Sequence, residues 1–117
     1  MELPRLEQEI NLLHERVCYA LGDPKRILIL YVLAEKGRYV NEISELLDMP
    51  QPTVSRHLRV LRERELVETD RQGPAVFYTI RDARIIEALD LMRGILTSQI
   101  EARVDLTQPY NRISKES

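Results

Sequence analysis

Apolar residues recur at steps of three and four along the N-terminal segment, which is the spacing of one face of an α-helix. This spacing predicts a helix over about residues 5–21, with an apolar face made of Leu6, Ile10, Leu13, Val17 and Leu21. Asp23 and Pro24 favour the start of a second helix, because Asp caps helix N-termini and Pro is tolerated in the first turn. This second helix, over about residues 24–36, is apolar around much of its circumference and is therefore expected at the centre of the core.

Two short helices joined by a tight break follow. The first is expected over about residues 40–47 and the second over about residues 51–65, with the break at residues 48–51. In the second of these helices Val54, Leu58 and Leu61 form one stripe. The opposite side carries small polar and arginine side chains, namely Thr53, Ser55, Arg56 and Arg59. Two such helices, with polar groups facing outward on the second, are typical of a helix-turn-helix.

The apolar period then changes from 3.6 to 2, which predicts a β-hairpin over residues 66–80. Its strands are expected at residues 66–69 and 75–80, and the turn at residues 70–74 places Arg71 near the tip.

A last helix is expected over about residues 83–103, and the polar tail, residues 107–117, is expected to be flexible. The predicted fold is a single domain over residues 1–106, mainly α with a small β-hairpin.

Charge is unevenly distributed along the 117 residues, although the net charge is only −2. Residues 51–84 contain seven basic and five acidic side chains, which leaves a charge of −4 on the rest. A mildly basic middle favours contact with phosphate there. No apolar run approaches the roughly 18 residues that span a bilayer, and the N-terminus lacks the features of a secretory signal. The single cysteine, Cys18, fits a reducing compartment, so a cytoplasmic protein without a membrane partner is expected.

Three segments resemble the ArsR/SmtB family of winged-helix repressors. Residues 20–30 (ALGDPKRILIL) are similar to its opening motif, and residues 51–58 (QPTVSRHL) to its recognition helix. The third segment, Arg71-Gln72-Gly73 leading to Val76-Phe77-Tyr78, is similar to its wing. The resemblance runs from about residue 17 to residue 92. It implies a homodimer built from the first and last helices that binds an imperfect inverted repeat in double-stranded DNA. It also implies a small effector, often a metal ion, that releases the DNA.

The best-known effector sites of this family are not present. The thiol positions of the arsenic sensors fall on Tyr39, Asn41 and Ser44, whereas trivalent arsenic needs thiolates. Of the four ligand positions of the zinc sensors only Asp82 matches, and the others fall on Arg84, Ile95 and Ser98. The effector is therefore unknown from the sequence, and no cofactor is expected.

The resemblance and the polar helix face together select the candidate DNA contacts. Arg56 and Arg59 are expected at phosphate or guanine, and Gln51, Thr53 and Ser55 nearer the base edges. Arg71 is expected along the DNA backbone or minor groove, with Gln72 beside it. His57 lies nearer the core side, where it is a packing or phosphate-contact residue. The candidate dimer contacts are Leu6, Ile10, Leu13, Val17, Leu89, Met92 and Leu96.

The sequence leaves other interpretations of its function open. His14 and Cys18 are four residues apart on one helical face and are candidate metal ligands. Such a metal site would need a further ligand, from Asp90, Glu101 or Asp105. The favoured interpretation is instead a buried Cys18 beside a partly exposed His14. Oxidation of Cys18 across a dimer would give a redox sensor. A winged helix used only for protein–protein contact would show an apolar face around Arg56. An enzyme is disfavoured, because the sequence contains no glycine-rich phosphate loop and no catalytic or metal-ligand set.

Overall fold

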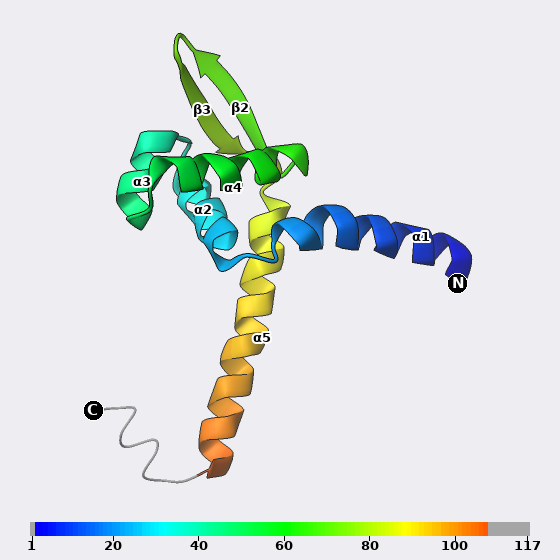
Figure 1. The fold of residues 1–117 in the computed structure, drawn as a ribbon. Coiled ribbons are helices and arrows are strands. Elements are labelled where there is room, and N and C mark those ends of the chain that lie inside the picture. The colour runs from blue at the N-terminus through cyan, green and yellow to red at the C-terminus, as the bar shows by residue number, and fades with distance from the viewer. Residues whose placement is uncertain (1, 108–117) are drawn as a thin grey trace. The chain divides into compact units, whose positions relative to one another are not determined.

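The structure is a computed structural model that describes residues 2–107, and it divides the chain into two compact units at Ala83. The first unit contains four α-helices, a π-helical turn and three strands, and the second contains a single helix, α5 (Arg84–Thr107). The mainly α architecture with a small sheet agrees with the prediction (Figure 1). Residues 90–103 of α5 are all exposed, and the single domain expected over residues 1–106 stays a prediction.

The N-terminal helix contains a π turn that the apolar spacing does not predict. Helix α1 (Leu3–Leu13) runs into the turn η1 (His14–Cys18), and helical geometry continues to Ala20. At the end of the turn, the Tyr19 N–H donates to the His14 carbonyl, five residues earlier. Neither α1 nor η1 has a buried residue, although Ala20 is fully buried. Single π turns are often found at functional sites.

Helices α2 (Pro24–Glu35), α3 (Val40–Leu47) and α4 (Gln51–Glu63) form the core (Figure 1). As expected from their sequence positions, Asp23 caps α2 by accepting a hydrogen bond from the Lys25 N–H at 2.8 Å, and Pro24 lies in the first turn. Helix α2 packs against α3, α4 and the sheet, but Leu28 is half exposed, so α2 is not enclosed on every side. The fully buried side chains of these helices are Ile29, Leu30, Ile43, Val54, Leu58 and Leu61.

The hairpin has a longer first strand and a shorter turn than predicted, whereas the second strand has the predicted bounds. Strand β2 (Val67–Gln72) pairs antiparallel with β3 (Ala75–Ile80), and Gln72 lies opposite Ala75. Only Gly73 and Pro74 form the turn. The φ of +66° at Gly73 followed by the fixed φ of Pro74 fits a type II′ turn, which matches the twist of the strands. Residues 70–72 are polar and lie in the exposed part of β2. They were predicted as part of the turn because turns have a similar polar composition. Arg71 therefore lies within a strand, opposite Val76.

A third strand, β1 (Arg38–Tyr39), was not predicted and pairs with β3, giving the order β1-β3-β2. The segment before it approaches β3 closely, since a Cβ on Gly37 would lie 2.4 Å from the Phe77 ring. Helix α2 ends at Glu35, one residue before its predicted end, and the Arg38 side chain, which is 9% exposed, stabilises that end. Its Nε donates to the Val32 carbonyl at 3.3 Å, and its Nη2 pairs with Glu35.

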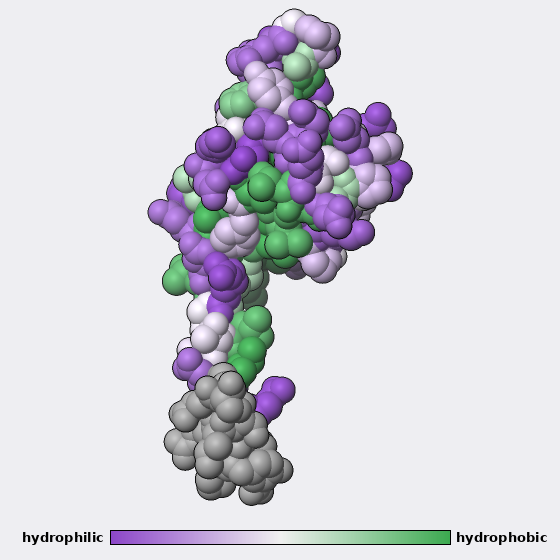
Figure 2. Space-filling model, turned by 90° about the vertical axis from the view of Figure 1, so that its left-hand side faces the viewer, coloured by the Kyte–Doolittle hydropathy of each residue, from purple (hydrophilic) through white to green (hydrophobic). Residues whose placement is uncertain are grey.

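Helix α5 presents many exposed apolar side chains (Figure 2). Leu89 is buried, at 4% exposed, whereas Leu91, Met92, Ile95, Leu96 and Ile100 are each 46% exposed or more. Of the expected flexible tail, Thr107 belongs to α5, and residues 108–117 lie outside the described residues. No helix among the described residues is long and apolar enough to span a membrane.

Candidate nucleic-acid interface

The break between α3 and α4 is built by backbone hydrogen bonds over residues 48–50. Asp48 ends α3 in the left-handed conformation, with a φ of 51°, and the Met49 N–H donates to the Ser44 carbonyl at 3.1 Å. The Pro50 carbonyl then accepts from the N–H groups of Thr53 and Val54 at 3.0 and 3.1 Å. These bonds satisfy backbone groups that a helix terminus leaves unpaired. The break therefore holds the N-terminus of α4 in a defined position beside α3.

Helix α4 has an apolar inner side and a polar outer side. Val54, Leu58 and Leu61 are fully buried, while Ser55, Arg56 and Arg59 are exposed. At the N-terminal end Gln51 is exposed and Thr53 is half-buried, and Arg56 Nη2 donates to Thr53 Oγ1 at 3.4 Å. Within residues 2–107 the Arg59 guanidinium makes no hydrogen bond or ion pair. The outer side thus combines short hydroxyls with available guanidinium groups, which suits base edges and phosphates.

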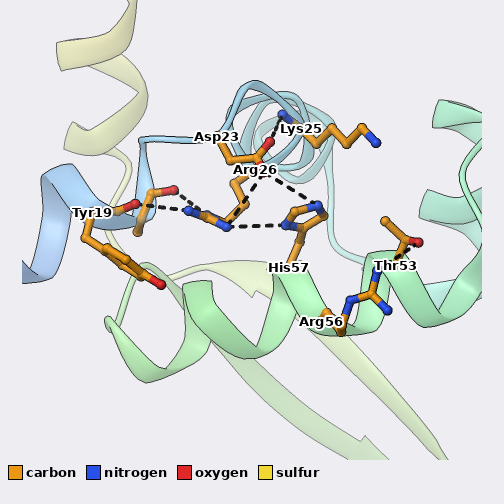
Figure 3. A network of polar contacts seen from close by, with 8 residues as sticks. Tyr19, Asp23, Lys25, Arg26, Thr53, Arg56 and His57 are labelled. Atoms are coloured by element: carbon orange, nitrogen blue, oxygen red, sulfur yellow. Dashed lines mark hydrogen bonds and ion pairs between the residues drawn. The ribbon is translucent and has the colours of Figure 1, made fainter.

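His57 lies on the inner flank of α4 and contacts the start of α2 (Figure 3). Its side chain is 14% exposed, with Nδ1 at 3.4 Å from Arg26 Nη1 and Nε2 at 4.0 Å from Asp23 Oδ2. A guanidinium can only donate, so Nδ1 accepts and the ring is neutral in this arrangement. Burial lowers the pKa of His57; Asp23 opposes this shift, and Arg26, Lys25 and Arg56 reinforce it. The structure thus gives this sequence-predicted residue partners inside the protein.

The two sequence-predicted residues of the wing differ in their surroundings. Arg71 is exposed, and across the part of the chain that is described its guanidinium has no hydrogen bond or ion pair. Both ends of the Gln72 amide are engaged, because Oε1 accepts from the Tyr39 hydroxyl and Nε2 donates to Asp70 Oδ2 at 3.3 Å. The Tyr39 ring also packs edge-on against Phe77, with centroids 5.1 Å apart. Arg71 is therefore available to a partner, whereas Gln72 braces the wing.

The basic residues counted in the middle of the sequence do not all face outward in the same way. Arg64 Nη1 donates to the Glu15 carbonyl at 2.8 Å, and Arg81 pairs with Glu65 at 3.7 Å. The exposed arginines of α4 and the wing are Arg56, Arg59, Arg62 and Arg71. Three side chains that hold these elements in place were not predicted from the sequence, namely Tyr39, Arg26 and Arg64. Each acts on a residue more than five positions away, so no local pattern marks them.

His14 and Cys18 are both exposed, which corrects the expectation of a buried cysteine. The cause is that no residue of η1 is buried within its own unit. The two side chains line an open pocket of about 510 Å³ together with Glu15, Tyr19, Gly22, Arg26 and Arg64. Among the described side chains no three His, Cys, Asp or Glu groups lie together in a way that would hold a metal ion. The proposed partner ligand Asp105 lies outside the described side chains.

Comparison with known proteins identifies relatives of this arrangement. Residues 23–69 match the model of the family of bacterial regulatory proteins named for arsR. An uncharacterized HTH-type transcriptional regulator of Methanocaldococcus jannaschii is 42% identical over 74 residues, which are 62% of this chain and 83% of that protein. The biofilm growth-associated repressor of Agrobacterium fabrum is 40% identical over 72 residues, 59% of this chain, and the match spans only 62% of that repressor.

Solved structures agree with the sequence matches. The solution structure of a homodimeric winged helix-turn-helix DNA-binding domain from Mycobacterium bovis, a possible ArsR-family regulator, superposes with a TM-score of 0.72. It is 28% identical, and the superposition covers 84% of this chain and 90% of that domain. The expected apolar face of a protein-interaction module is not found around Arg56, where the neighbouring residues Ser55 and Arg59 are polar and exposed.

Proposed function

The chain belongs to the ArsR family of bacterial HTH-type transcriptional regulators, and we propose that it is a repressor that binds operator DNA as a homodimer through α4. Helix α4 enters the major groove with Gln51, Thr53 and Ser55 near the base edges. Arg56 and Arg59 contact phosphate or guanine, and Arg71 contacts the DNA backbone or minor groove beside the wing.

One observation supports this function above all others: the outer side of α4 is polar and exposed, while its inner side is fully buried. The helix cannot rotate to hide its arginines without exposing Val54, Leu58 and Leu61. Burying each of these three side chains is worth about 1.5–3 kcal/mol, so the outer side is held toward solvent. Arg59 and Arg71 are then free to replace the counterions of a duplex.

Exposed apolar residues on α1 and α5 support the homodimer. On α1 the predicted contacts Ile10 and Leu13 are 48% and 45% exposed, and on α5 Met92 and Leu96 are 49% and 54% exposed. Helices with so much exposed apolar surface commonly bury it in a partner, and a two-fold dimer is the commonest solution. Two copies of α4 related by such an axis would match the half-sites of an inverted repeat.

The repressor acts by occupying promoter DNA in the cytoplasm, and a small effector releases it. No catalytic step is part of this function, in keeping with relatives that are named as regulators and repressors. His14 and Cys18 remain the candidate ligands if that effector is a metal ion, and Cys18 is the candidate reactive group if it is an oxidant.

Selection of bound sequences from a random duplex pool tests the proposal. We expect an inverted repeat, and an affinity whose logarithm falls linearly with the logarithm of salt concentration. Arg59→Gln should flatten that slope by about one unit, since one phosphate contact accounts for about 0.9. Arg5→Gln, which removes one exposed positive charge from α1, is the matched control and should leave the slope unchanged. Recovery of no repeat, or equal slopes for the two variants, would overturn the proposal.

A further inference from the structure

Arg26 joins the end of the N-terminal helix to the recognition helix through all three nitrogens of its guanidinium (Figure 3). Nε donates to the Ala20 carbonyl at 2.7 Å and Nη2 to the Tyr19 carbonyl at 3.0 Å, while Nη1 lies 3.4 Å from His57 Nδ1 on α4. The side chain is only 12% exposed. Because a guanidinium is planar and rigid, these contacts fix the direction between the two helices as well as their distance.

A second connection joins the other end of α4 to the π turn. Arg64, the residue that follows α4, donates from Nη1 to the Glu15 carbonyl at 2.8 Å, and its guanidinium lies 4.5 Å from the centre of the Tyr19 ring. Arg16 pairs with Glu65 at 3.0 Å. Helix α4 is therefore held against the same short segment, residues 15–20, at its middle and at its C-terminal end.

We propose that Arg26, supported by Arg64, is a positioning residue for DNA binding: it fixes α4 relative to the N-terminal helix and thereby sets the distance between the two recognition helices of the dimer. This inference rests on the proposed function, in which α1 contributes to the dimer interface and α4 reads DNA. Neither arginine needs to touch the DNA. Their effect is on geometry.

Small changes at this connection are amplified along α4. The helix has 13 residues and is therefore about 20 Å long. A rotation of about 10° around its Arg64 end would displace Gln51 at the other end by about 3 Å, which is about the length of a whole hydrogen bond. In a dimer that must place two helices about 34 Å apart on one face of the duplex, such a shift changes which half-site spacing fits.

Affinity for a series of operators tests this inference. The selected inverted repeat is synthesised with its spacer unchanged and with one or two base pairs added or removed, together with a duplex of unrelated sequence. The affinity of the wild type for one spacer should exceed its affinity for the others by about tenfold or more, which is about the effect of one mismatched base pair in a binding site. Arg26→Gln should lose most of that preference, while its affinity for the unrelated duplex changes no more than that of Lys25→Gln.

Lys25→Gln is the matched control, since it removes the same charge from the neighbouring, exposed position. Arg26→Lys keeps the charge, but its three donors sit on one nitrogen and cannot span acceptors on both helices as the planar guanidinium does. It should therefore restore affinity for the unrelated duplex without restoring the spacer preference. If Arg26→Gln is unfolded by circular dichroism, Arg64→Gln carries the same expectation.

The outcomes separate two failures. A wild type that selects no inverted repeat overturns the proposed function and this inference with it. A wild type with a preferred spacer, together with Arg26→Gln and Arg64→Gln variants that keep the preference or weaken binding to every duplex by one common factor, overturns the positioning role alone.

Discussion

Replacing Gly37 with alanine should destabilise the first unit, because the segment before β1 lies against β3 without room for a side chain. The new Cβ would lie 2.4 Å from two carbons of the Phe77 ring and 2.8 Å from Thr79 Cγ2. To reach an ordinary carbon–carbon contact of about 3.5 Å, the ring must retreat by about 1 Å. The ring is packed edge-on against Tyr39, whose hydroxyl is bonded to Gln72, so it cannot move alone.

Overpacking of this kind typically costs about 1–3 kcal/mol. For a chain of this size the corresponding fall in Tm is about 4 °C per kcal/mol. Thermal unfolding of wild type and variant at one protein concentration measures it, since the Tm of a dimer depends on concentration. Phe77→Leu should relieve the contact, so the double variant should be more stable than the sum of the two single effects predicts.

Gly94→Ala is the matched control. No atom lies within 4 Å of the position of its Cβ, and Gly94 is inside α5, where alanine is favoured over glycine by about 0.5–1 kcal/mol. The same chemical change should therefore raise Tm at residue 94 and lower it at residue 37. If Gly37→Ala is as stable as the wild type, the close approach of residue 37 to β3 is not as described.

Three further outcomes are expected. The pKa of His57 in the folded protein is lowered from 6.5, so the unfolded chain binds the proton more readily. The wild type should therefore lose stability as the pH falls below about 6.5, and His57→Gln should lose less. Urea unfolding of both proteins at about pH 7.5 and about pH 5.5 measures the difference, and a constant gap would contradict the assignment. Arg71→Ala should weaken binding to all duplexes alike and reduce the salt slope by about one, whereas a change of base preference would place Arg71 at base edges instead. Leu96→Glu should convert the dimer to a monomer in sedimentation, because it places a charge in the proposed interface. Leu91→Glu, which changes the most exposed large apolar residue of α5, should leave the dimer intact. The reverse result would place the interface on the other side of the helix.

The helices and the hairpin could be predicted because their signals are local. The Asp23-Pro24 start, the buried stripe of Val54, Leu58 and Leu61, and the alternation over residues 75–80 each depend on residues within one element. The polar outer side of α4 followed from the same stripe by helix geometry alone.

The parts that were missed depend on contacts between distant residues. Strand β1 has only two residues and forms because it pairs with β3 about forty positions later. A segment this short shows no periodicity from which it could be predicted. The partners of His57 come from the start of α2, and those of Gln72 include Tyr39. The length of β2 was underestimated because an exposed strand tolerates the same polar residues as a turn.

The central claim, that the outer side of α4 occupies the major groove at two half-sites, is tested most directly by methylation interference on the selected operator. Methylation of guanine N7, which lies in the major groove, should block binding at two clusters about one helical turn apart. Interference confined to adenine N3 in the minor groove, or to a single cluster, would contradict it.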